Sequence, residues 1–338
     1  MLKIQENILL KDFNTFKIGG PARYFAVVKS DEDLMEALAF SRTRKLPLFI
    51  LGGGSNLLIS DHGFVGLILK NEIKGIKFID QENDQVILEV GAGEILDEVM
   101  GLSVIRKLAG LENLSGVPGT VGGAVVQNAG AYGMEIKDHL VSVAGFNLTN
   151  GKEFIFKKKD CQFSYRSSLF KKNKKFIITT INFELSKKPL FNLDYAGLKN
   201  KFVNVAEINP AKIRDAVLQI RAEKLPDWHK IGTAGSFFKN PVIGAEKYAE
   251  LKEKYENIPG FSDIGEKVKV PLAWILDNIC HLKGYQEGKV NLYEKQPIIL
   301  VNSGGATASE IINFASKIKN IVKEKTGIEI EYEVEIIH

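Results

Sequence analysis

Cysteine and histidine are scarce in this chain, and long apolar runs are missing. The two cysteines among 338 residues, Cys161 and Cys280, cannot build a disulfide framework. The five histidines are scattered without the spacing of metal ligands, so we expect no bound metal. No stretch approaches the roughly 18 consecutive apolar residues of a membrane span, and the first residues lack the apolar core of a signal peptide. These absences favour a cytoplasmic protein with no membrane partner.

Opposite charges nearly balance, with 45 Lys and Arg residues against 41 Asp and Glu and a net charge of +4. This excess is too small to indicate nucleic acid as a partner. Lysine-rich runs at 157–159 and 171–175 flank Tyr165 and Arg166. Such runs are typical of a solvated surface, although they could also attract an anionic substrate. No sustained apolar stripe predicts a subunit interface, so we expect a monomer.

The length allows two or three domains. Residues 20–70 alternate strand and helix, with a strand at 24–28, a helix capped by Ser30 that runs to Arg42, and a strand at 46–50. Residues 70–205 are strand-rich, and we predict strands at 85–90, 141–148, 153–156 and 176–185. A helix that begins at Asn209 and Pro210 is expected to open a third domain.

The last hundred residues carry three local signals. The run 271–279 is expected to be helical, with Cys280 and His281 as core packing beside it. Apolar residues at helical spacing predict an amphipathic helix over 309–325, which Gly327 ends. From 328 to 337 isoleucine, tyrosine and valine alternate with glutamate, a pattern that predicts a strand with one buried face.

Two glycine-rich loops are the most informative feature. Glycine lets main-chain N–H groups turn toward one anion, and two such loops indicate one long, phosphate-bearing cofactor. Neither loop has the GxGxxG or GxxxxGK[ST] pattern, so neither a Rossmann site nor a P-loop is indicated. An ordinary turn remains the alternative, chiefly for the first loop. The expected cofactor contacts are Gly52, Gly53, Gly54, Ser55 and Asn56 in the first loop, and Gly116, Pro118, Gly119, Gly122, Gly123, Asn128, Ala129 and Gly130 in the second.

Further motifs stand in order around these loops: NTFKIGGPA at 14–22, FSYRSS at 163–168, GSFFKNP at 235–241, and Glu333 before Val334. Together they closely resemble the UDP-N-acetylenolpyruvoylglucosamine reductase (MurB) family, flavoenzymes of peptidoglycan precursor synthesis. The resemblance implies an α+β fold, an FAD-binding fold of the vanillyl-alcohol-oxidase type plus a C-terminal α/β substrate-binding domain. Its two FAD-binding subdomains would span 1–70 with 327–338, and 71–208; the substrate domain would span 209–326.

The same resemblance implies the ligands. The glycine loops would hold FAD non-covalently, NADPH would supply the hydride, and the enolpyruvyl UDP-sugar would then take the place of NADPH. The segment around Tyr195 resembles the subclass in which a mobile loop tyrosine closes over the nucleotide of the substrate. The substrate contacts implied are Tyr165, which would also lie near the flavin or nicotinamide, and Tyr195, Lys224, Asn240, Lys283 and Gln296.

Arg166, Ser236 and Glu333 match the catalytic positions of the family. Hydride addition to an enol ether requires stabilisation of the charge that arrives on the adjacent carboxylate, and the planar guanidinium of Arg166 suits that carboxylate. Glu333, if protonated, could donate a hydrogen bond to the enolate. Ser236 would give the proton to the ether-bearing carbon.

Two other classes of function stay open. The same flavin scaffold serves oxidases that use oxygen and often bind the flavin covalently through His or Cys, but no histidine lies in the glycine loops. A nucleotide- or RNA-binding module that uses the lysine runs would leave Arg166, Ser236 and both loops unexplained. Residues 227–230, Asp-Trp-His-Lys, are bulkier and more basic than expected for the family, and 288–291 are less apolar, which puts nearby substrate contacts in doubt.

Overall fold

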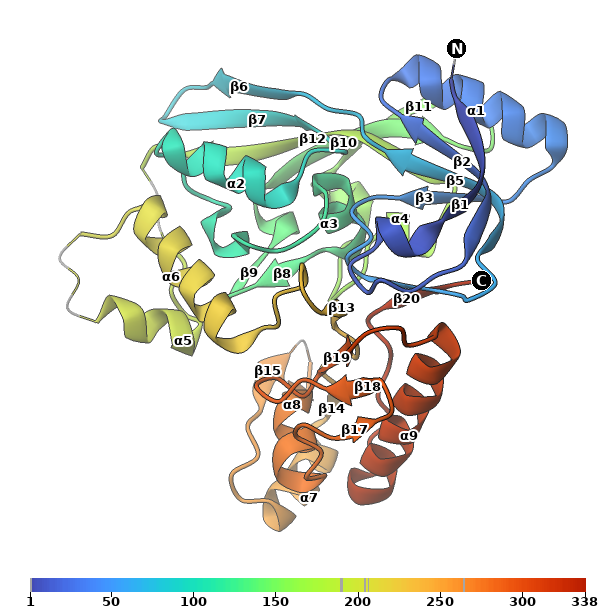
Figure 1. The fold of residues 1–338 in the computed structure, drawn as a ribbon. Coiled ribbons are helices and arrows are strands. Elements are labelled where there is room, and N and C mark those ends of the chain that lie inside the picture. The colour runs from blue at the N-terminus through green and yellow to red at the C-terminus, as the bar shows by residue number, and fades with distance from the viewer. Residues whose placement is uncertain (1, 189–190, 204, 206, 264) are drawn as a thin grey trace. The chain divides into compact units, whose positions relative to one another are not determined.

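The computed structural model describes residues 2–188, 191–203, 205, 207–263 and 265–338 (Figure 1). The chain forms two compact units and passes between them several times. The first unit contains Met1–Ile8, Ala22–Gly53 and Val65–Glu223. The second contains Leu9–Pro21, Gly54–Phe64 and Lys224–His338.

The first unit is built on two main sheets, of orders β1-β2-β5-β3 and β11-β10-β12-β7-β6, and a small β8-β9 hairpin. The strands are β1 (Ile4–Leu9), β2 (Pro21–Val28), β3 (Leu48–Leu51), β5 (Phe64–Asn71), β6 (Ile76–Asp80), β7 (Gln85–Gly91), β8 (Gly130–Ala131), β9 (Met134–Glu135), β10 (Leu140–Asn147), β11 (Glu153–Lys157) and β12 (Phe176–Ser186). Every strand predicted between residues 24 and 185 is therefore confirmed, and each predicted end lies within three residues of the observed end.

The helices of the first unit are α1 (Asp31–Arg44), α2 (Leu96–Ile105), α3 (Val121–Gln127), α4 (Leu169–Lys172), α5 (Ala196–Lys199) and α6 (Pro210–Lys224). Ser30 caps α1 as predicted, since its hydroxyl accepts from the Asp33 N–H at 3.2 Å. Asn209 caps α6 in the same way, accepting from the Lys212 N–H at 3.0 Å. In both cases the side chain satisfies an N–H that the first helical turn leaves open.

Helices α2 and α3 cover one face of the five-stranded sheet (Figure 1). Along β7 the side chains of Val86, Leu88 and Val90 alternate inward and are fully or almost fully buried. They pack in one core with residues of α2 and α3, among them Val99 and Val125. The segment between these two helices carries the second glycine-rich loop, so this core positions that loop.

The second unit contains a sheet of order β13-β19-β18-β17, a sheet β14-β16-β15 and a parallel pair β20-β4. Its strands are β4 (Leu57–Ile59), β13 (Gly232–Ser236), β14 (Val242–Gly244), β15 (Phe261–Asp263), β16 (Lys267–Lys269), β17 (Gln286–Glu287), β18 (Val290–Leu292), β19 (Ile299–Asn302) and β20 (Glu335–Ile337). Its helices are α7 (Ala245–Lys254), α8 (Leu272–Trp274), continued by a π-helical turn over Ile275–Ile279, and α9 (Ala308–Thr326).

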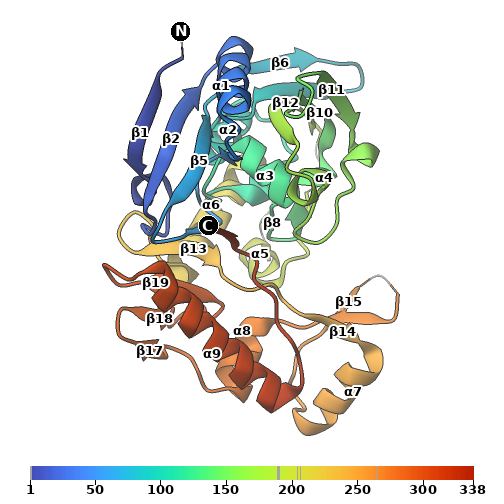
Figure 2. The same ribbon diagram turned by 90° about the vertical axis from the view of Figure 1, so that its right-hand side faces the viewer.

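Helix α9 lies across the β19-β18-β17 sheet (Figure 2). Its buried stripe, which includes Ile311, Ile318 and Val322, packs in one core with Leu292 and Leu300 of that sheet. Gly327 follows the helix at φ 72°, a left-handed conformation that suits glycine. The predicted amphipathic helix over 309–325 is confirmed, and so is the helical run at 271–279.

Two expectations about the last third of the chain need correction. Residues 328–337 do not form one strand, because only Glu335–Ile337 form a strand, with β4, while Tyr332 makes an isolated bridge with Phe238. The alternation of buried and exposed residues holds from 328 to 331, and the Lys239 N–H, which donates to the Glu331 carbonyl at 2.9 Å, ties this stretch to an irregular segment instead of a strand. Helix α6, expected to open a third domain at 209, groups with the first unit, where Ile213 and Val217 pack against Leu198.

Asp61 anchors the start of α9 and gives a test of the second unit. Its carboxylate accepts from the Ala308 N–H at 2.8 Å and the Ser309 N–H at 3.1 Å. Asp61→Ala leaves both N–H groups without this partner and removes a negative charge from the N-terminus of α9, so we expect a loss of about 1–2 kcal/mol of unfolding free energy. Urea denaturation measures it; a midpoint equal to that of the parent protein contradicts the anchoring role.

Candidate active site

The two glycine-rich loops meet main chain to main chain in the first unit. A Cβ built on Gly53 would lie 2.5 Å from the Cα of Gly119, and one built on Gly52 would lie 2.8 Å from the Thr120 hydroxyl oxygen. Side chains at these positions would force the segments apart. The prediction that both loops serve one site is therefore consistent with their direct contact in this unit.

The second loop is more regular than an open cradle. It contains α3, which Thr120 caps by accepting from the Gly123 N–H at 3.3 Å. The Gly122 N–H donates to the Ala92 carbonyl at 2.9 Å, and a Cβ on Gly122 would lie 2.8 Å from the Cβ of Ala92. Gly122 thus serves close packing, and the main-chain N–H groups of Gly122 and Gly123 are already bonded within the chain.

Gly116 is also used for packing. Its N–H donates to the Asp97 carboxylate at 2.6 Å, and its Cα faces Leu218 and Arg221 of α6. Burial raises the pKa of Asp97, but the hydrogen bonds from Arg214 and Gly116 outweigh it, so the net shift is downward. A charged Asp97 therefore holds the entry to the second loop against α6.

The contact of the loops leaves bare main chain, which fits a cofactor that lies against it. Lys70 of β5 stands beside this surface, where its ammonium donates to the Gly52 carbonyl. Burial lowers the pKa of Lys70. Gly52, Gly53 and Gly119 with Lys70 would be the residues closest to a bound dinucleotide such as FAD. The cofactor roles of the other loop residues, Ser55 and Pro118 among them, stay predictions.

Tyr165 and Arg166 form the tip of a tight turn. Ser164 and Ser167 exchange two main-chain hydrogen bonds of 3.0 Å, which leaves only Tyr165 and Arg166 between them. Arg166 has φ 53°, a left-handed conformation that is uncommon for non-glycine residues and that the tight turn imposes. Its guanidinium carbon lies 5.6 Å from the centre of the Tyr165 ring. The turn fixes where the guanidinium can reach.

The second glycine loop holds this turn in place. Asn128, which is fully buried, donates from Nδ2 to the Ser164 carbonyl at 3.0 Å and to Glu135 at 3.0 Å. A Cβ on Gly130 would lie 3.1 Å from a terminal nitrogen of Arg166. The side chain of Asn128 is thus occupied by the turn, so its predicted contact with the cofactor would have to come from the main chain. Ala129 and Gly130 supply main-chain groups to the β8-β9 hairpin.

In the second unit the segment that follows Ser236 contacts the segment of Glu333 through main chain. Ser236 ends β13 next to Phe237 and Phe238, whose rings are almost fully buried and pack against Tyr332. The Glu333 N–H donates to the Phe237 carbonyl at 2.9 Å. Two segments almost a hundred positions apart in the sequence are therefore joined by a main-chain hydrogen bond, and the catalytic roles of Ser236 and Glu333 stay predictions.

Asn56 of the first loop closes this arrangement within the second unit. Its Nδ2 donates to the Glu333 carbonyl at 3.1 Å, and its own carbonyl accepts from the Glu335 N–H at 3.0 Å. Asn56 was predicted as a cofactor contact, and the structure shows it holding Glu333. Gly54 precedes it with its Cα against Phe13 and Asn14, with no room for a side chain.

The predicted substrate contacts of the second unit have mixed surroundings. Asn240 accepts from the Leu272 N–H at 2.9 Å and so supports the start of α8. Lys283 lies 3.6 Å from the Asp277 carboxylate, and Gln296 forms a turn in which its carbonyl accepts from Ile299 at 3.0 Å. Lys224 is the exposed last residue of α6. Of the pair expected as core packing, Cys280 is buried, and burial raises the pKa of its thiol to about 11, but His281 is exposed.

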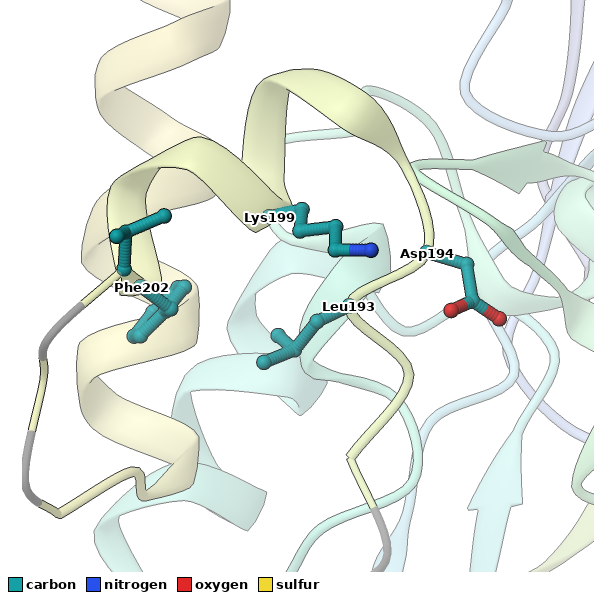
Figure 3. A pocket seen from close by; sticks show the side chains of 5 residues that line it. Leu193, Asp194, Lys199 and Phe202 are labelled. Carbon is teal, nitrogen blue, oxygen red and sulfur yellow. The ribbon is translucent and has the colours of Figure 1, made fainter.

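Tyr195 lies in the first unit on the segment before α5, and its side chain is 38% exposed. A shallow cavity of about 280 Å³ adjoins this segment, lined by Leu193, Asp194, Lys199, Phe202 and Val203 (Figure 3). Figure 3 shows the Lys199 ammonium reaching toward the side of Asp194. None of the predicted catalytic residues lines this cavity, so it is not assigned to the chemistry.

Comparison with known proteins decides the family. Residues 22–154 match the model of an FAD-binding domain, and residues 226–337 match the C-terminal domain of UDP-N-acetylenolpyruvoylglucosamine reductase. The reductase of Pseudomonas syringae pv. syringae is 37% identical over 335 residues, 98% of each chain. The reductase of Bacteroides fragilis is 36% identical over 336 residues, 99% of this chain and 100% of that one. The chain belongs to the UDP-N-acetylenolpyruvoylglucosamine reductase family.

A solved structure supports the fold of this reductase family member. The MurB reductase of Thermus caldophilus aligns over 100% of both chains with a TM-score of 0.71 at 24% identity. The predicted fold, an FAD-binding region followed by the C-terminal domain of the family, is confirmed. As a family member the chain is a flavin-dependent oxidoreductase with FAD as cofactor. The subclass with the tyrosine lid stays a prediction.

The described residues contain neither a membrane-spanning helix nor a metal cluster. No helix among them is both long and apolar enough to cross a bilayer. Within the same residues, His, Cys, Asp and Glu side chains form no group of three or more that could hold a metal ion.

The contact between Gly53 and Gly119 yields a direct test. Gly53→Ala places a methyl group 2.5 Å from main chain, so the loops must separate at a cost of about 1–3 kcal/mol. We expect FAD to bind about tenfold more weakly or worse, measured by fluorescence titration. Gly101→Ala in α2 is the control, because the new methyl meets only Arg214 at 3.7 Å. Equal FAD affinity in Gly53→Ala and the parent rules out this contact as part of the cofactor site.

Proposed function

We propose that this chain reduces UDP-N-acetylenolpyruvoylglucosamine to UDP-N-acetylmuramate, a step of peptidoglycan precursor synthesis, with NADPH as the hydride donor. The observation that supports the proposal is the main-chain bond between Glu333 and Phe237, which holds the backbone of Glu333 against the residue that follows Ser236. We propose that the two acid groups, Ser236 and Glu333, share one site there. When bound, FAD supplies the hydride chemistry, because it accepts a hydride from one substrate and gives it to another.

Arg166 binds the carboxylate of the enolpyruvyl group in this proposal. Hydride addition to the double bond moves negative charge onto that carboxylate, and a fixed cation lowers the energy of the charge as it develops. The two-residue turn and its hydrogen bonds hold Arg166 before substrate arrives, so little reorganisation is needed. The planar guanidinium can donate two parallel hydrogen bonds to the two carboxylate oxygens.

Ser236 and Glu333 complete the reaction. Ser236 gives its hydroxyl proton to the ether-bearing carbon of the enolate, a strong base that a weak acid can protonate from hydrogen-bond distance. Glu333, whose N–H donates to the carbonyl of Phe237, the residue after Ser236, contributes a carboxyl group that, when protonated, donates a hydrogen bond to the enolate. Asn56 fixes the backbone of Glu333 and so the reach of that carboxyl group.

The remaining assignments belong to the same proposal. Tyr195 closes over the nucleotide of the UDP-sugar, and Lys224 and the other predicted contacts, Tyr165, Asn240, Lys283 and Gln296, complete substrate recognition. Ser55, Pro118 and the glycines of both loops form the FAD site, in which Gly54, Gly116 and Gly122 shape the loops by close packing. The protein acts as a cytoplasmic monomer on a small-molecule substrate, without nucleic acid or membrane. For a truncation study we propose the predicted domains, 1–70 with 327–338, 71–208 and 209–326, with the last boundary moved to follow α6, which packs in the first unit.

Arg166→Lys tests the carboxylate contact. An ammonium keeps the charge but cannot reproduce the two parallel hydrogen bonds, so we expect reoxidation by the enolpyruvyl substrate to slow by about tenfold or more. Reduction by NADPH should persist, because it does not involve this carboxylate. Stopped-flow absorbance follows each half-reaction. Arg106→Lys is the control, since Arg106 also stands over an aromatic ring, Phe78, at 4.4 Å. Parent-like reoxidation in Arg166→Lys removes the role.

Ser236→Ala separates hydride transfer from proton transfer. The variant should bind FAD and accept hydride from NADPH, since neither step needs a hydroxyl near the ether-bearing carbon. Turnover of the enolpyruvyl substrate should fall by about 10²–10⁴-fold, the usual loss for one positioned general acid. Ser236→Cys should recover part of it, because a thiol can also donate a proton. Turnover by Ser236→Ala within a few-fold of the parent would overturn the proton-donor assignment.

A further inference from the structure

Asn113 forms a bridge between two segments of the first unit. It is 1% exposed, and its Nδ2 donates to the Tyr132 carbonyl at 2.7 Å and to the Asn192 carbonyl at 2.9 Å. Tyr132 belongs to the end of the second glycine loop, and Asn192 stands three residues before Tyr195. One buried carboxamide therefore ties the segment of Tyr195 to the glycine loop.

Asn192 strengthens this bridge from the other side. Its Nδ2 donates to the Gly133 carbonyl at 2.9 Å, and its Oδ1 accepts from the Asp194 N–H at 3.1 Å. The amide of Asn192 thus shapes its own segment and binds the loop at once. With the two bonds of Asn113, three side-chain hydrogen bonds join the segments, and we call these three bonds the asparagine clasp.

Aromatic contacts continue the clasp to Tyr195 itself. The rings of Tyr132 and Tyr195 meet edge to face, with centres 5.1 Å apart and planes at 85°. Burial raises the pKa of Tyr132, and the neighbouring guanidinium of Arg221 opposes that rise. Burial in turn lowers the pKa of Arg221. Tyr132 is therefore held by burial and by Arg221, and the partly exposed ring of Tyr195 packs against its ring.

We propose that Asn113 is a positioning residue that holds Tyr195 in its binding-competent place and so couples substrate affinity to the second glycine loop. The inference rests on the proposed role of Tyr195 as a contact of the substrate. A carboxamide is suited to this task because its NH₂ group has two donors, and both carbonyls lie within reach only while the segments are docked. Breaking the clasp leaves the buried carboxamide of Asn113 and two carbonyls in part-buried hydrogen bonds without these partners, so separation of the segments is opposed.

A prediction follows for ligand affinity. We call the segment of Tyr195 docked when the clasp is formed. If only the docked segment binds nucleotide well, the apparent affinity is the intrinsic affinity multiplied by the docked fraction, so destabilising the clasp lowers it. The effect should act through Tyr195 and leave the chemistry at Ser236 untouched. Asn113→Asp is the sharpest change, because it preserves the shape of the side chain but replaces the two donors by an oxygen that faces two carbonyls.

The experiment uses the FAD-loaded full chain with UDP-N-acetylglucosamine as the probe, measured by calorimetry at neutral pH. Asn113→Asp should weaken binding by about tenfold or more, because the carboxylate cannot donate to the two carbonyls and the unpaired polar groups destabilise the clasp. In the Tyr195→Ala variant, Asn113→Asp should change probe affinity little further, because Asn113 acts on affinity through the side chain of Tyr195. Hydrogen exchange of amides 191–199 should be faster in Asn113→Asp without any ligand.

Two further variants keep the test decisive. Asn71→Asp is the matched control: Asn71 is 6% exposed and its Nδ2 donates to the Ile178 carbonyl at 2.8 Å, so the same chemical change occurs away from the clasp. It should leave probe affinity and exchange of 191–199 at parent values. Asn192→Asp serves if Asn113→Asp fails to fold, because it is an exposed position that keeps the acceptor for Asp194 and loses only the bond to Gly133.

The outcomes separate this inference from the proposed function. If Tyr195→Ala binds the probe like the parent, the assumed role of Tyr195 is wrong. If Tyr195→Ala weakens binding but neither clasp variant does, or if exchange of 191–199 is unchanged, Asn113 does not position Tyr195. Tighter binding in Asn113→Asp would also overturn the inference, because it would show that the docked segment competes with the ligand.

Discussion

The close approach of main chain at Gly53 and Gly119 is the constraint on which the site of the first unit depends. A methyl group at Gly53 would lie 2.5 Å from Gly119, so two segments more than sixty residues apart can meet only as bare backbone. From this contact the second loop runs through α3 to Asn128, which holds the Tyr165–Arg166 turn. It then continues to Tyr132, on which the segment of Tyr195 is docked.

The local elements of the fold were largely predictable from the sequence, and their partners were not. Ser30 and Asn209 mark helix starts because their side chains accept from an N–H of the first turn, and Gly327 marks a helix end because it adopts a left-handed backbone conformation. Each of these is a local property. The strand predicted over 328–337 was wrong because alternation shows only which side chains are buried. Here the segment packs against an irregular segment around Phe237 as well as against a strand. The grouping of α6 with the first unit depends on contacts with Leu198 that no local pattern encodes.

The candidate site likewise contains residues that a motif identifies and residues whose role depends on their contacts in the fold. Arg166, Ser236 and Glu333 could be found by motif, and the main-chain bond between Glu333 and Phe237 supports the proposed grouping of the last two. The roles of Asn56 and Asn128 could not, since short polar residues in glycine loops suggest ligand contacts, whereas here their amides hold Glu333 and the Tyr165–Arg166 turn. Asn113 gave no signal at all, because a buried amide that bridges two carbonyls is recognised only when both carbonyls are known.

The central claim is that the chain passes hydride from NADPH to an enolpyruvyl UDP-sugar through bound FAD. An anaerobic spectroscopic titration of the purified, FAD-loaded protein tests it most directly. The account predicts that NADPH bleaches the flavin absorbance near its visible maximum, and that one equivalent of UDP-N-acetylenolpyruvoylglucosamine restores it while UDP-N-acetylmuramate forms in equal amount. Absorbance that stays bleached with this substrate and returns only when oxygen is admitted would contradict the account and identify an oxidase instead.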